Sequence, residues 1–184
     1  MKILVLSDTH GDLRKVFQIY EKLNNIDLIL HCGDHQKDAD TLENALGTPT
    51  VSVKGNCDGA QTADRKTVQT PAGKILLTHG HLDGAGCDPL RLKYLAEENQ
   101  CIAVCFGHTH VPVCEKENGI YLINPGSLSR PRDGSNGSYA VIHSNEQEFY
   151  ANIVFYDTVC GGNGKKGKTQ GGFLRGLLNY SDRF

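Results

Sequence analysis

The sequence lacks the features that would place this chain in a membrane, in an oxidising compartment or on a nucleic acid. No apolar run approaches the roughly 20 residues of a membrane-spanning helix, and the first residues do not resemble a signal peptide. The seven cysteines form no Cys-x-x-Cys pair, which argues against a disulfide framework and a thiolate zinc site. The formal net charge is −2 and the one basic block is 165–168, so no nucleic-acid platform or membrane-binding patch is expected. We therefore expect a cytoplasmic protein with reduced thiols.

Length and composition predict one domain followed by a short tail. The regular strand and helix patterns lie within residues 1–160, which is long enough to bury a substantial core. Residues 161–184 begin as a Gly- and Lys-rich linker and end in a short amphipathic cluster. No internal repeat is present, so we expect no second domain.

In the first third of the chain, apolar runs end abruptly in polar residues. The runs cover residues 2–6, 26–30 and 49–53. Apolar residues at helical spacing lie between them, at 13–23 with Asp12 as the expected N-cap and at 38–46. This alternation predicts βαβ units and a parallel sheet, in which a ligand site lies at the carboxyl ends of the strands.

The second half of the chain has hairpin patterns and predicts antiparallel strands. We expect hairpins over 67–77 and 111–123, a helix over 89–99, and strands at 101–106, 138–143 and 149–159. The two halves together predict an α/β fold with two packed sheets and helices outside.

Oxygen and nitrogen donors recur where the predicted strands end. They are Asp8, His10, Asp34, Asn56, His79, His108 and His110. A single first-row ion rarely takes more than about six ligands, so seven donors fit two metals sharing a carboxylate, for which Asp34 is the natural bridge. A donor set without thiolate favours Mn²⁺, Fe or Zn²⁺.

The segments SDTH, CGD, GNCD, THGH and GHTH, in this order, resemble the calcineurin-like metallophosphoesterases. The NPGS segment at 124–127 is similar to that of the compact phosphodiesterases of the YfcE type. The resemblance implies a four-layer α/β/β/α sandwich of two mixed sheets flanked by helices. It also implies two divalent ions, Mn²⁺ being favoured over Zn²⁺, Fe or Ni²⁺, and hydrolysis of small phosphate esters by a water activated between them.

The same resemblance assigns the donors to two ions. The first would take Asp8, His10, Asp34 and His110, and the second Asp34, Asn56, His79 and His108. We expect His81 either to contact the substrate phosphate and transfer protons or to orient a ligand, and we name it with Asn56 as a candidate catalytic residue. Many members of the wider superfamily carry a His after this Asn; here the residue is Cys57, and a neutral thiol is a poor acid for an alkoxide leaving group.

Other polar residues near the motifs receive supporting roles. We expect His31 and His35 to lie behind the ligands or on the surface, His143 to be structural, and Asn124 and Ser127 to support the site. Two more, Arg130 and Arg132, fit either a phosphate clamp or an exposed loop.

Two other functions remain open from the sequence. A non-catalytic protein-interaction scaffold of the same fold, similar to the retromer subunit, would need no intact metal site, whereas every donor position is present here. A DNA-repair-type nuclease would need a basic surface. No long insertion separates the motifs, which predicts an open site and leaves the substrate and any homo-oligomeric state undefined.

Overall fold

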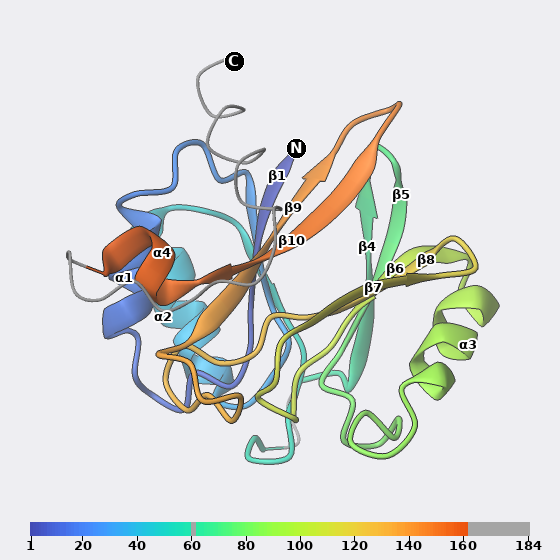
Figure 1. The fold of residues 1–184 in the computed structure, drawn as a ribbon, viewed down its shortest axis with the longest axis horizontal. Coiled ribbons are helices and arrows are strands. Elements are labelled where there is room, and N and C mark those ends of the chain that lie inside the picture. Colours follow the sequence, from blue (N-terminus) through green and yellow to red (C-terminus); the bar gives the residue numbers. More distant parts are fainter. Residues whose placement is uncertain (60–61, 162–184) are drawn as a thin grey trace.

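The computed structural model describes residues 1–59 and 62–161 and contains two five-stranded sheets. The first sheet has the order β10-β9-β1-β2-β3 and the second the order β4-β5-β6-β8-β7. Helices α1, α2 and α4 cover the outer face of the first sheet and α3 covers that of the second (Figure 1). The predicted four-layer sandwich is therefore confirmed, while the predicted tail at 162–184 lies outside the described residues.

The first sheet is built from both ends of the described chain. Its elements are β1 (Lys2–Leu6), α1 (Arg14–Tyr20), β2 (Leu28–His31), α2 (Gln36–Leu46), β3 (Thr50–Ser52), β9 (Ser138–Ser144), β10 (Phe149–Phe155) and α4 (Tyr156–Cys160). Strands β1, β2 and β3 are parallel, as the βαβ pattern predicts, and β9 pairs antiparallel with the free side of β1.

The second sheet is one continuous stretch of chain. It comprises β4 (Arg65–Thr70), β5 (Gly73–Thr78), α3 (Leu90–Glu98), β6 (Cys101–Cys105), β7 (Val113–Glu117) and β8 (Ile120–Asn124). The prediction of an antiparallel second half is wrong for its centre, because β5, β6 and β8 are parallel. The β7–β8 hairpin folds back so that β8, rather than β7, pairs with β6, and β7 becomes the edge strand.

The apolar run of β1 shows why the central strands contain so few polar residues. Ile3 and Val5 point into the core between the two sheets, whereas Leu4 and Leu6 point into the core beneath α1 and α2. Successive side chains of a strand alternate faces, so a strand covered on both sides needs apolar residues at every position. Within the described residues, no helix is long and apolar enough to cross a membrane.

Several element boundaries differ from the sequence-based expectation. The strand predicted to reach residue 159 ends at Phe155. Phe155 pairs with Ser138, the first residue of β9, so later residues have no strand residue to pair with. The following residues form α4 instead, and Tyr156 N–H donates to the Gly137 carbonyl (2.8 Å). Strand β7 begins only after Pro112, which has no N–H for a sheet ladder.

The first helix is also shorter than predicted. It ends at Tyr20 rather than residue 23, and its N-cap is Leu13, so the prediction that Asp12 is the N-cap is wrong. The carboxylate of Asp12 is engaged by the backbone N–H (3.2 Å) and Nε–H (2.9 Å) of Arg14.

Candidate metal centre

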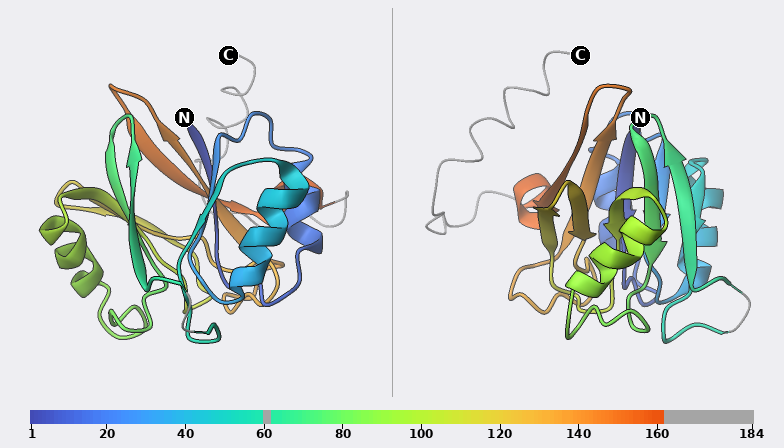
Figure 2. Two further views of the ribbon diagram at one scale, coloured as in Figure 1. Left: turned by 180° about the vertical axis from the view of Figure 1, so that it is seen from behind. Right: turned by 90° about the vertical axis from the view of Figure 1, so that its right-hand side faces the viewer.

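The seven donors lie together in loops at the end of the sandwich away from the N-terminus (Figure 2). Asp8 and His10 follow β1, Asp34 follows β2 and Asn56 follows β3. From the second sheet, His79 follows β5, and His108 and His110 follow β6. The site therefore spans the seam between the sheets, at the carboxyl ends of the parallel strands, as the sequence predicts.

One cluster of donor atoms surrounds His110. Its Nε2 lies 3.1 Å from Asp8 Oδ1 and 3.4 Å from His10 Nε2. The His10 Nε2 is in turn 3.8 Å from Asp34 Oδ2. Asp8, His10 and His110 thus form a group that is compact enough to hold one ion.

A second cluster surrounds the side-chain oxygen of Asn56. This Oδ1 atom lies 3.0 Å from His79 Nε2 and 3.0 Å from His108 Nδ1. The other oxygen of Asp34, Oδ1, is 3.5 Å from His79 Nε2. Asp34 therefore presents one oxygen to each cluster, which is the arrangement expected of a bridging carboxylate.

Hydrogen bonds fix which ring nitrogens carry protons. His79 Nδ1 contacts the Cys32 carbonyl (2.8 Å) and His110 Nδ1 contacts the Arg130 carbonyl (2.6 Å). Because a carbonyl oxygen only accepts, both Nδ1 atoms must donate, and both Nε2 lone pairs face carboxylate oxygens across the site.

In this arrangement the lone pairs of imidazole nitrogens and carboxylate oxygens face one another. A cation bound between them would remove the repulsion. Asp8 Oδ1 is buried and makes no hydrogen bond of good geometry, although His110 Nε2 is 3.1 Å away. The close contact with the Asp8 carboxylate raises the pKa of His110. The donor set fits divalent metal ions, which also require neutral imidazoles; burial lowers the pKa of His10 and of His108 and keeps both neutral.

The backbone around the donors is held in an uncommon conformation. Five of the seven donors have positive φ angles, namely Asp8 (54°), His10 (47°), Asp34 (60°), His108 (70°) and His110 (59°). Such left-handed residues cost of order 1–3 kcal/mol each and cluster at functional sites. The strain indicates that the loops are shaped for the positions of their side chains.

The glycines of the motifs allow these loops to approach one another closely. A Cβ on Gly107 would collide with Ser7 Oγ and lie 2.7 Å from Asp8 Oδ2. Likewise, a Cβ on Gly55 would collide with Asp34 Oδ1. Glycine is therefore required at both positions for packing of the donor loops.

The residues predicted to support the site do so through specific hydrogen bonds. The Asn124 amide donates to the Gly107 carbonyl (2.9 Å) and to Thr109 Oγ1 (3.0 Å), which holds the loop between the two histidines. Ser127 Oγ donates to the Asp8 carbonyl (2.9 Å) and accepts from the Arg130 N–H (2.9 Å).

Two supporting aspartates did not emerge from the sequence. Asp58 accepts from the N–H groups of His35 (2.9 Å), Gln36 (2.8 Å) and Gly55 (2.9 Å), so it joins the start of α2 to the Asn56 loop. The position of Asp58 at the end of the GNCD segment could have suggested this role. The second aspartate, Asp38, was predicted only as the first residue of a helix.

Asp38 belongs to a buried network behind the first cluster. Its Oδ2 accepts from Thr9 Oγ1 (2.6 Å) and the Gly11 N–H (2.8 Å). Thr9 Oγ1 also lies 2.9 Å from Nε2 of His31, which is the last residue of β2 and fully buried. His35 Nδ1 is 3.2 Å from Asp38 Oδ1. Both histidines therefore lie behind the donor loops, one buried and the other partly exposed.

Other candidate residues lie around the rim. The ring of His81 is centred 5.2 Å from that of His79 and 6.2 Å from that of His108, and burial lowers its pKa. Cys57 Sγ shares a compact group with ligand atoms of His10 and Asp34; hydrogen bonding to Asp34 raises the pKa of this thiol, which keeps it protonated. His143, by contrast, pairs with Lys2 at the other end of β1 and stacks on Tyr150.

The chain belongs to the calcineurin-like phosphoesterase superfamily, whose family model matches residues 1–147. It is 39% identical over 160 residues to "Probable metallophosphoesterase YsnB" of Bacillus subtilis, covering 85% of this chain and 91% of YsnB. It is 30% identical over 188 residues to "Phosphodiesterase YfcE" of Escherichia coli K12, covering 84% of this chain and 98% of YfcE.

Solved structures agree with this assignment. A Streptococcus pneumoniae TIGR4 protein described as a predicted phosphoesterase superposes with a TM-score of 0.71 at 30% identity, covering 85% of this chain and 90% of that one. Vps29 of Entamoeba histolytica, complexed with zinc, gives a TM-score of 0.67 at 22% identity, covering 85% of this chain and 99% of Vps29. At that identity, the second likeness shows the fold alone.

Proposed function

We propose that this protein is a cytoplasmic phosphodiesterase that hydrolyses small phosphate esters with the help of two divalent ions, Mn²⁺ being the favoured metal. The observation that carries the proposal is the position of Asp34, whose two oxygens face two separate groups of donors. Asp8, His10 and His110 would complete the first site, and Asn56, His79 and His108 the second. When bound, the ions supply Lewis acidity to the phosphoryl oxygens and lower the pKa of a water nucleophile.

The protein groups around the donors have separate tasks in this proposal. The carbonyl groups of Cys32 and Arg130 orient His79 and His110 by accepting from their Nδ1 atoms. His81 lies beside the second cluster, has a pKa lowered by burial, and has a buried Nδ1 without a hydrogen-bond partner among the described residues. An imidazole in this position, once it carries a second proton, is suited to transfer that proton to the leaving oxygen, which the thiol of Cys57 does poorly.

Turnover of bis-p-nitrophenyl phosphate and cyclic nucleotides by purified, Mn²⁺-loaded protein tests the proposal. We expect metal-dependent hydrolysis, and we expect Asp34→Asn and His79→Ala to reduce it by at least about a hundredfold, because the first removes the charge and one bridging oxygen and the second removes a donor. His143→Ala is the matched control, since this histidine lies at the opposite end of β1. Absence of turnover with Mn²⁺, or full turnover in the Asp34 variant, would refute the proposal.

The alternative is a non-catalytic interaction scaffold of the same fold. Elemental analysis after incubation with Mn²⁺ separates the two functions. The enzyme proposal predicts about two ions per chain, whereas a scaffold with a degraded site predicts well under two. All seven donor positions are present and close together, which favours the enzyme.

A further inference from the structure

Two arginines beside the first cluster have no role in the chemistry described above. Arg130 and Arg132 are exposed, and within residues 1–59 and 62–161 neither guanidinium group forms an ion pair or a hydrogen bond. The acidic residue of the same loop, Asp133, accepts instead from the N–H (3.2 Å) and Oγ (2.7 Å) of Ser135. Neither guanidinium group thus has a carboxylate partner among the described residues.

The backbone that carries these arginines is fixed to the donor loops. The Arg130 carbonyl accepts from His110 Nδ1 (2.6 Å), and the Arg132 N–H donates to the His110 carbonyl (3.2 Å). Ser127 and Ser129 hydroxyl groups donate to the Asp8 carbonyl at 2.9 Å each. The two side chains therefore project from a segment held in place at the first cluster.

Charge is distributed unequally across the two ends of the site. The charge of Arg130 acts on His10 and that of Arg132 acts on His110, both on the side of the first cluster. On the side of the second cluster, the charged groups are already paired, Lys54 with Asp64 (3.0 Å) and Arg65 with Asp83. An anionic group that extends beyond the scissile phosphate therefore finds cations without a carboxylate partner only on the first of these two sides, among the described residues.

We propose that Arg130 and Arg132 bind a second anionic group of the substrate, so that this enzyme prefers phosphodiesters carrying an additional phosphate over those without one. Guanidinium groups suit this task because their planar donors match phosphate oxygens in bidentate geometry. The inference rests on the proposed phosphodiesterase function and deepens it by naming the substrate class and its orientation. The additional phosphate would lie over the His10–His110 side of the site.

A matched pair of substrates tests this preference. Thymidine 5′-(p-nitrophenyl phosphate) and its 3′-phosphorylated form release the same chromophore and differ only in the second phosphate. For wild-type protein loaded with Mn²⁺ we expect kcat/KM to be roughly five- to tenfold higher with the 3′-phosphate, a modest factor because the arginines are exposed. In an Arg130→Gln/Arg132→Gln variant the ratio of the two kcat/KM values should fall to about one, whatever the absolute rates.

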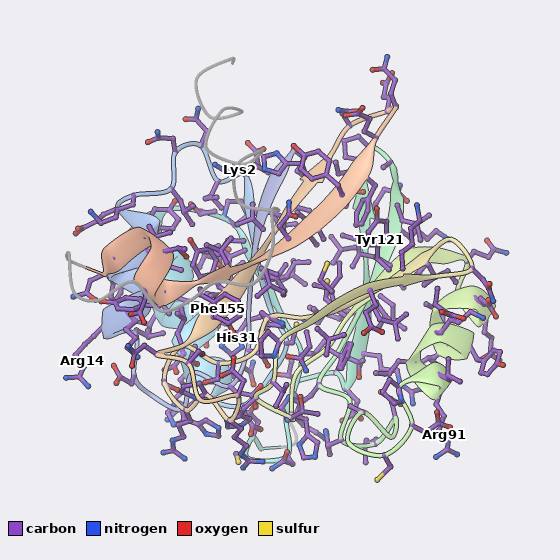
Figure 3. The ribbon with its side chains drawn as sticks, viewed as in Figure 1. Lys2, Arg14, His31, Arg91, Tyr121 and Phe155 are labelled. Atoms are coloured by element: carbon purple, nitrogen blue, oxygen red, sulfur yellow. The ribbon has the colours of Figure 1, made fainter. Side chains whose placement is uncertain are left out.

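The control and a binding measurement separate failure of this inference from failure of the proposed function. Arg91→Gln removes one exposed arginine on α3, on the outer face of the second sheet (Figure 3), and should preserve the preference. Titration calorimetry compares thymidine 3′,5′-bisphosphate with thymidine 5′-monophosphate on the same proteins and needs no turnover. If neither ester is hydrolysed but the bisphosphate binds more tightly through both arginines, only the function proposal fails. No preference in the wild type, an unchanged preference in the double variant, or an equal loss in Arg91→Gln overturns the inference.

Discussion

At the scale of single residues, the pair His108 and His110 shows how two neighbouring side chains serve different clusters. His108 Nδ1 lies 3.0 Å from Asn56 Oδ1, whereas His110 Nε2 lies 3.1 Å from Asp8 Oδ1. Both residues have positive φ, and the chain turns between them. Their two-residue spacing alone would also allow both imidazoles to bind one ion, so the division depends on the loop conformation.

Replacing either histidine with alanine should therefore remove mainly one ion. We expect Mn²⁺ content, measured by elemental analysis after dialysis, to fall from two ions to about one per chain in His108→Ala and in His110→Ala. His143→Ala should retain both ions. Loss of both ions in either variant would show that the two histidines do not divide between the clusters.

A second residue-scale prediction concerns Gly107. The change Gly107→Ala forces the Ser7 and Asp8 side chains away from the loop and should lower the free energy of unfolding by about 1–3 kcal/mol, the usual range for overpacking. Gly86→Ala is the control, because no heavy atom lies within 4 Å of the added Cβ. Urea unfolding of the metal-free proteins measures both; equal stability of the two variants would contradict the packing described for Gly107.

At the scale of elements, helix α2 begins without a cap from its own N-cap residue. The side chain of His35 makes no capping hydrogen bond. Instead, Asp58 in the loop after β3 accepts from the N–H groups of His35 and Gln36. Asp58→Ala should destabilise the fold by about 1–2 kcal/mol, as loss of a helix cap does. Asp40→Ala, on the exposed side of the same helix, serves as the control in chemical unfolding. Similar effects of the two substitutions would argue against this capping role.

The loop after β5 is tied to β4 by a buried carboxylate, which predicts a pH dependence. Burial alone would raise the pKa of Asp83, but hydrogen bonds from Arg65 and Thr78 lower it below 3.8. A lowered pKa in the folded state means that this carboxylate stabilises the fold above pH 3.8 and that its contribution is lost as the pH falls through the folded-state pKa. Acid unfolding followed by circular dichroism should show a shallower loss of stability in Asp83→Asn than in wild type. An identical pH profile in both proteins would contradict this assignment.

At the scale of the whole molecule, the donors come from both sheets, so metal binding should stabilise the entire fold. An ion that binds only the folded state contributes about 2.7 kcal/mol at a hundred times its Kd. For a chain of this size that corresponds to a rise in Tm of roughly 5–10 °C. Differential scanning calorimetry with EDTA and with excess Mn²⁺ measures the difference, which should be much smaller in Asp34→Asn. An equal rise in both proteins would indicate binding elsewhere.

The sequence predicts the layers and the gathering of polar residues at the strand ends because both depend on local patterns. The apolar run of β1 and the polar residues that follow it are visible in a few consecutive positions. The parallel pairing of β6 with β8 was missed, because a hairpin pattern at 111–123 does not reveal which of its strands joins the sheet. Asp38 was missed as a supporting residue because its partners Thr9 and Gly11 come from another loop.

The order of the strands along the chain has a consequence for biosynthesis. Residues 65–124 supply every strand of the second sheet, but β1 becomes a central strand only when β9 pairs with it, more than a hundred residues later. Contacts between distant segments form slowly, and translation proceeds from the N-terminus. The strands that lead to His79, His108 and His110 are therefore synthesised before β9 can lock the strand that leads to Asp8 and His10. A nascent chain still on the ribosome should hold metal poorly until β9 and β10 have emerged, so that acquisition of the ions becomes one of the last steps of maturation.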